Sequence, residues 1–191
     1  MIYNMDFLIS AMVILLLILW HFLGQKRAED LNNRVFLFFA VLGTADVVAE
    51  FFTNYYITSY NSDMENAAVI VTTIFYLLQA LLPVTFIFYI QTLHEQKIIS
   101  AKKMFISGVP TLVLISVILT NPFTEKLFSF DVTAGYMKGP WYLLMYVSAL
   151  GHFAVALLLI LLWRKKLGPQ KEKILLEIFV ISGVGVVLQM F

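Results

Sequence analysis

The chain has 191 residues, of which 61% are hydrophobic, and its mean hydropathy is +0.87. Soluble domains carry a smaller apolar share, so this composition predicts a protein that resides in the lipid bilayer. The formal net charge of +1 gives no basis for binding nucleic acid, and the lack of cysteine excludes disulfides, thiolate catalysis and cysteine-ligated metals.

Six apolar stretches follow one another along the chain, and each approaches the length of about 20 residues that a helix needs to cross a bilayer. They predict an all-α fold, a polytopic bundle of transmembrane helices in one domain, because a β-barrel would show short alternating segments instead. We expect spans at about residues 7–23, 35–56, 67–93, 104–120, 141–163 and 174–191.

The basic residues predict how the bundle is oriented. Eleven of the thirteen Lys and Arg residues lie in the loops at 24–34, 94–103 and 164–173, and the remaining two lie in the loop at 121–140. Lys and Arg accumulate in cytoplasmic loops, so we expect the first three loops in the cytoplasm and the N-terminus outside.

Two carboxylates in the second predicted span are the strongest indication of a functional site. Asp46 lies near the middle of the span, and Glu50 follows four residues later on the same helix face. A charged group at mid-membrane costs about 2.5–3.5 kcal/mol on insertion scales, so both must face the bundle interior or water. They form a polar ligand pocket or a cation site, or alternatively a structural cluster that shares a proton.

Polar residues in other spans extend this candidate site. His152 lies in the fifth span at roughly the depth of Asp46, where it either pairs with a carboxylate or is held by a single packing hydrogen bond. Tyr76 and Gln79 share one face of the third span with Thr72 and either line the same cavity or join helices by ordinary interhelical hydrogen bonds.

Two further features concern shape. Pro83 lies inside the third span, where it removes one helix hydrogen bond and is expected to act as a kink or hinge. The loop at 121–140 contains Leu127, Phe128 and Phe130 between two turn-forming pairs, so these side chains either lie on the bilayer or cover the bundle.

The sequence carries no recognisable catalytic motif. It has no HExxH, GxSxG or phosphate-binding loop, and its three His residues are far apart. We therefore expect no catalytic residue, cofactor or metal in this chain.

Short motifs spread over the chain carry a resemblance to a known family. They are EDLNNRVF at 29–36 followed by Leu42-Gly43 and Asp46, IFYLLQ at 74–79 followed by Leu82-Pro83, TNP at 120–122 with Leu127-Phe128, and GPW at 139–141. Together they resemble the N-terminal seven-helix sensor regions of bacterial diguanylate cyclases, the GGDEF proteins. Related seven-helix regions precede certain sensor histidine kinases.

The resemblance implies a sensing module of the bacterial cytoplasmic (inner) membrane. It implies that an unknown small ligand or ion regulates a C-terminal GGDEF domain, which makes cyclic di-GMP as a homodimer. The family has seven spans and this chain has six predicted ones, so we expect a sensor truncated after the sixth helix and not an enzyme by itself. The alternatives are the sensor region of a histidine kinase and a small ion-coupled transporter that uses Asp46 and Glu50.

Overall fold

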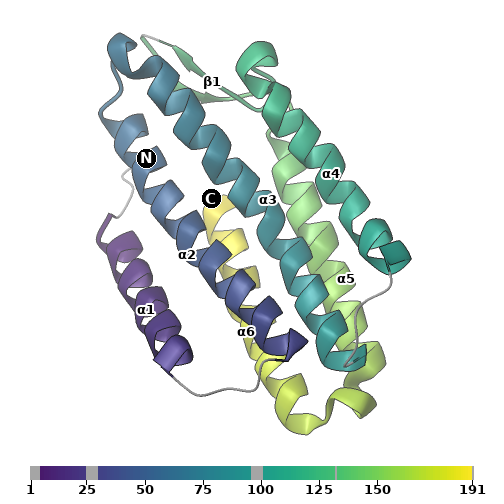
Figure 1. Cartoon of the computed structure of the whole chain (residues 1–191). Coiled ribbons are helices and arrows are strands. Elements are labelled where there is room, and N and C mark those ends of the chain that lie inside the picture. Colours follow the sequence, from purple (N-terminus) through teal and green to yellow (C-terminus); the bar gives the residue numbers. More distant parts are fainter. Residues whose placement is uncertain (1–4, 25–29, 96–100, 132, 191) are drawn as a thin grey trace.

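The computed structural model describes residues 5–24, 30–95, 101–131 and 133–190. At residues 5–7, 62, 95, 101–106 and 181–190 it describes the backbone but not the side chains. Over this part of the chain it contains six α-helices, one 3-10 turn at Ser62–Met64 and one β-hairpin (Figure 1). The elements are α1 (Met5–Gly24), α2 (Leu31–Thr58), α3 (Glu65–Glu95), α4 (Ala101–Thr124), β1 (Phe128–Asp131), β2 (Gly135–Lys138), α5 (Leu143–Leu167) and α6 (Pro169–Met190).

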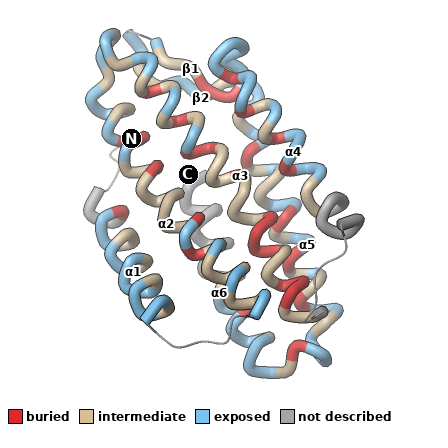
Figure 2. The backbone as a smooth tube through the Cα atoms, in the orientation of Figure 1, coloured by how far each residue is buried: buried red, intermediate tan, exposed pale blue. Residues whose placement is uncertain are grey.

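Four of these helices are long and apolar enough to cross a membrane. They cover Leu31–Thr58, Glu65–His94, Ser107–Thr124 and Leu143–Leu167, and the shorter Leu8–Gly24 is also apolar. Large apolar side chains such as Leu17, Phe38 and Leu162 are exposed, and exposed residues make up much of the outside of the bundle (Figure 2), as expected where lipid replaces water. The all-α membrane fold is thus confirmed in this coarser form, and the number of six crossings stays a prediction.

Helix α3 lies in the middle of the bundle and contacts α2, α4 and α5, whereas α1 packs on α2 and α6 packs on α5 (Figure 1). Its residues Phe75 and Tyr76 join a buried cluster near the hairpin, and Phe86 and Ile90 join a second one near the basic residues that end α5. We call these two ends of the bundle the hairpin end and the basic end.

Several element boundaries differ from the expected ones. Helix α4 reaches Thr124, past the predicted end at 120, and α5 ends at Leu167, past the predicted end at 163. The extension of α5 carries Arg164, Lys165 and Lys166, whose charges are favourable at a helix C-terminus. Helix α3 continues through Pro83 without interruption, so the proline does not end it.

The hairpin covers one end of the bundle. Its strands are antiparallel, with Phe128 opposite Lys138 and Asp131 opposite Gly135. Leu127 and Phe128 are almost completely buried against α3, α4 and α5. Of the two alternatives for this loop, the structure therefore confirms that Leu127 and Phe128 cover the bundle.

One side chain fixes the hairpin to α4. The amide of Asn121 donates from Nδ2 to the Phe128 carbonyl at 2.9 Å, and its Oδ1 accepts from the backbone N–H groups of Leu127 at 2.7 Å and Phe128 at 3.3 Å. At the far end of the hairpin, Gly139 packs directly against the backbone of Lys126. A Cβ at this position would overlap the carbonyl of Lys126.

The two lysines of this end lie over aromatic rings. The Lys126 Nζ is 4.3 Å from the centroid of Trp141, and the Lys138 Nζ is 4.5 Å from that of Tyr142. Such contacts place a positive charge over an aromatic face while its head group stays in a polar environment. This arrangement is typical of residues at a membrane–water interface.

We predict that Asn121→Ala destabilises the protein by about 1–3 kcal/mol, because it leaves buried backbone groups of Leu127 and Phe128 without partners. The measurement is the free energy of unfolding in detergent. Thr124→Ala is the matched control, since the exposed Thr124 hydroxyl bonds only to a carbonyl of its own helix. Equal stability of the two variants would contradict the role of Asn121.

The hydrogen bonds within the hairpin turn make its stability depend on pH. The hydroxyl of Thr133 and then the backbone N–H groups of Ala134 and Thr133 donate to Asp131, and they hold the pKa of this carboxyl below its usual value. The turn is therefore fully stabilised above the unfolded pKa of about 3.9, and this stabilisation is lost as the pH falls through the lower folded pKa. Thr133→Ala should raise the pKa of Asp131 toward its usual value in an NMR titration, and an unchanged pKa would contradict this account.

Candidate functional site

Helix α2 places two carboxylates one turn apart within a membrane-crossing segment. The helix begins at an N-cap, where the Asp30 side chain accepts from the Asn33 N–H at 2.8 Å, and it continues without a break past Asp46 and Glu50. Both carboxylates are half-buried. The Oδ1 atom of Asp46 is shielded from solvent and has no hydrogen-bond partner within the described part of the chain.

The arrangement of this pair determines its chemistry. Glu50 lies one helical turn from Asp46 on the same face of α2, and two neighbouring negative charges in a medium of low dielectric repel each other. The pair can relieve this repulsion by taking up a proton, by sharing one, or by binding a cation. No group of three His, Cys, Asp or Glu side chains suited to a metal occurs among the residues that the structure describes.

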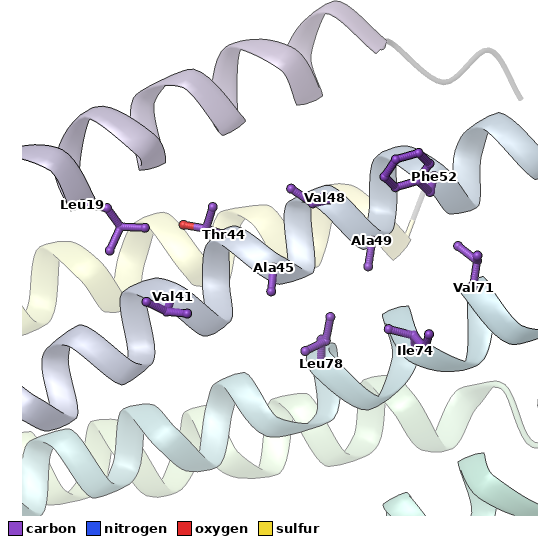
Figure 3. A pocket seen from close by; sticks show the side chains of 10 residues that line it. All are labelled: Leu19, Val41, Thr44, Ala45, Val48, Ala49, Phe52, Val71, Ile74 and Leu78. Carbon is purple, nitrogen blue, oxygen red and sulfur yellow. The ribbon is translucent and has the colours of Figure 1, made fainter.

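The opposite face of α2 is apolar and borders a pocket of about 520 Å³ between α1, α2 and α3 (Figure 3). Leu19 of α1, Ala45 and Val48 of α2 and Ile74 and Leu78 of α3 point toward it. Neither carboxylate is among its lining residues. Helix α2 therefore separates an apolar pocket from the polar candidate site.

His152 belongs to a different group of residues. Its Nε2 lies 2.9 Å from the hydroxyl of Thr111 on α4, and its Nδ1 lies 2.7 Å from the carbonyl oxygen of Ser148. A carbonyl only accepts, so Nδ1 carries the proton and Nε2 accepts from Thr111. Of the two alternatives for His152, the structure does not have the pairing with Asp46 or Glu50, because both ring nitrogens are bonded elsewhere.

Tyr76 also has a partner away from the carboxylates. Its hydroxyl lies 2.6 Å from that of Tyr136 in the hairpin, and its ring packs against Phe128 and Tyr142. This residue joins α3 to the hairpin, which is neither of the two roles expected from the sequence, because its partner Tyr136 lies in strand β2 and not in a helix. Gln79, which the sequence also suggested as a residue of the candidate site, is half-buried on the same helix.

The structure thus divides the predicted site into three parts. Asp46 and Glu50 stay together on α2, Tyr76 joins the hairpin, and His152 connects α4 with α5. Thr111 was not among the residues expected from the sequence. A single threonine in an apolar helix looks the same whether its hydroxyl bonds to its own helix or to a residue such as His152.

Comparisons with known proteins add no relative. No protein-family model matches the chain, and neither the curated proteins nor the solved structures give a match.

We predict that Thr111→Val destabilises the bundle by about 1–3 kcal/mol. Valine is similar in size to threonine but lacks the hydroxyl that donates to Nε2 of the buried His152. Unfolding in detergent measures the effect. Thr120→Val, in an exposed position of the same helix, is the control. If His152→Phe removes as much stability in the Thr111→Val background as in the original chain, the two side chains do not act together.

Proposed function

We propose that this chain is the membrane-embedded sensing module of a larger signalling protein. The observation that supports it is the pair of Asp46 and Glu50 inside a membrane-crossing helix, where Asp46 has a shielded oxygen that no described residue of the chain bonds. Ionisable groups at such a position are costly and are retained mainly for function. The proposed signal is a small ligand or cation that binds at this pair, and the chain itself carries out no reaction.

The proposed topology has six crossings in the bacterial cytoplasmic membrane, with the N-terminus outside. The separation of charge along the bundle supports this orientation. Arg164, Lys165 and Lys166 end α5 at the basic end, whereas the lysines of the hairpin end lie on aromatic rings. Since basic residues accumulate in the cytoplasm, the basic end faces inside and the hairpin faces outside.

The proposed output is a cytoplasmic GGDEF domain that works as a homodimer, as the resemblance of the sequence motifs implies. The bundle offers a route for the signal, because α2 contacts α3, α3 contacts α5, and α5 contacts α6. A ligand shifts this arrangement only if it binds one packing of the helices more tightly than another. A histidine kinase output would use the same route.

The test replaces Asp46 by Asn and Glu50 by Gln in the full gene product that contains this chain. A charged hydrogen bond contributes about 1.5–3 kcal/mol, so we expect the apparent affinity for a cationic signal to fall at least about tenfold. Cellular cyclic di-GMP is the measurement, taken over a series of external ion and ligand concentrations. Glu177→Gln is the matched control, since this exposed carboxylate lies 3.9 Å from Lys173 on the surface of α6. A response that survives both substitutions would refute the sensing role of the pair.

The same carboxylates support one other function, a small ion-coupled transporter in which they relay a proton or cation. Purified chain in liposomes distinguishes the two functions. Ion flux that Asp46→Asn abolishes would favour the transporter, and a ligand-dependent output without flux would favour the sensor.

A further inference from the structure

The hairpin-end halves of α2 and α3 contain buried polar atoms without partners. Thr53 and Asn54 of α2 are each 3% exposed, and Thr72 of α3 is fully buried. The Oγ1 of Thr53, the Nδ2 of Asn54 and the Oγ1 of Thr72 have no hydrogen-bond partner in the part of the chain that is described. Such groups are rare in folded proteins, and each needs an explanation.

Other threonines of the same helices bond their hydroxyl groups to their own backbone. Thr44, Thr58 and Thr73 each donate to the carbonyl oxygen four residues earlier, at distances of 2.7–2.9 Å. This local bond is the ordinary way for a helical threonine to satisfy its hydroxyl in an apolar environment. The hydroxyls of Thr53 and Thr72 do not make it, so they need another partner.

The two threonines lie at about the same depth. A Cβ on Gly43 of α2 would lie 3.8 Å from the Leu82 side chain of α3, which fixes the register of this antiparallel pair. Thr53 and Thr72 are equally far along their helices from that contact, toward the hairpin end. Both hydroxyls are thus in the same layer of the bundle.

This layer is continuous with the carboxylates. Asp46, Glu50 and Asn54 follow one another at intervals of four residues, so they share one face of α2. Beyond them the hydroxyl of Tyr60, whose ring stacks on Phe130 of the hairpin at 5.1 Å, is likewise shielded and without a partner. Polar atoms therefore run from the hairpin end to the middle of the span.

We propose that the Thr53–Asn54–Thr72 layer is a binding pocket for water and small hydroxyl-bearing solutes, through which the hairpin-end solution reaches Asp46. Hydroxyl groups both donate and accept, and Nδ2 of Asn54 requires an acceptor. Water and small alcohols meet both needs, and water is the usual partner of otherwise unpaired buried groups. A bare cation does not satisfy the amide donor.

The test uses single cysteines, because the natural chain contains none. Thr53→Cys and Thr72→Cys keep the size of the side chain. Their matched controls are Phe52→Cys and Ile70→Cys, which lie at nearly the same depth but are exposed and apolar. The proteins are placed in liposomes with a positively charged, membrane-impermeant methanethiosulfonate reagent on both sides, and the rate of modification is measured.

Only a hydrated thiol forms the reactive thiolate, so we expect Thr53→Cys and Thr72→Cys to react at least about tenfold faster than the controls. Rates for both test positions within about threefold of the controls would show that solutes from the hairpin-end solution do not reach the layer and would overturn the proposal. A monodisperse elution profile confirms that each variant is folded. The biological role of the pocket rests on the proposed function. The labelling experiment does not, because it needs no output domain. Fast labelling with a signal that survives Asp46→Asn would refute only the sensing role.

Discussion

Within a membrane, a polar group must find its partner in the protein or in enclosed water, because the hydrocarbon offers none. Several threonines in these helices meet this requirement locally, as Thr44 and Thr73 do by bonding to their own backbone. Where the bond is not local, it connects elements, and His152 with Thr111 joins α5 to α4 in this way. The same requirement gives the unpaired oxygen of Asp46 its importance, since nothing described in the protein satisfies it.

The arrangement of the bundle follows from the central position of α3. This helix supplies residues to both buried clusters, and it touches the helices that carry the carboxylates and His152. The hairpin closes one end of the bundle through its contacts with α3 and α4, mainly the Tyr76–Tyr136 pair and the amide of Asn121. Helix α3 thus connects the helix that carries the carboxylates with the helix that carries His152, because it contacts both α2 and α5.

The sequence predicted the helical spans well because hydrophobic length is a strong, local signal, and the segments around Asp46 and Glu50 fell within a helix as expected. It could not predict the hairpin, since strand pairing between 128–131 and 135–138 depends on the amide of Asn121 and the close approach of Gly139, neither of which a pattern of apolar residues reveals. Nor could depth along a span decide which helices are neighbours. His152 and Asp46 have similar depth, yet His152 faces Thr111 because α5 packs on α3 and α4.

The two unlike faces of α2 limit how this helix can move. Val48 borders an apolar pocket on one side (Figure 3), and on the other side Asp46 has an oxygen that is shielded from solvent. Turning the helix by half a revolution would bring a carboxylate into contact with hydrocarbon, at a cost of about 2.5–3.5 kcal/mol for a charged group at mid-membrane. Sliding along its axis or tilting keeps each face in its own environment. The chemistry of its surface therefore favours sliding or tilting of α2 over rotation about its axis.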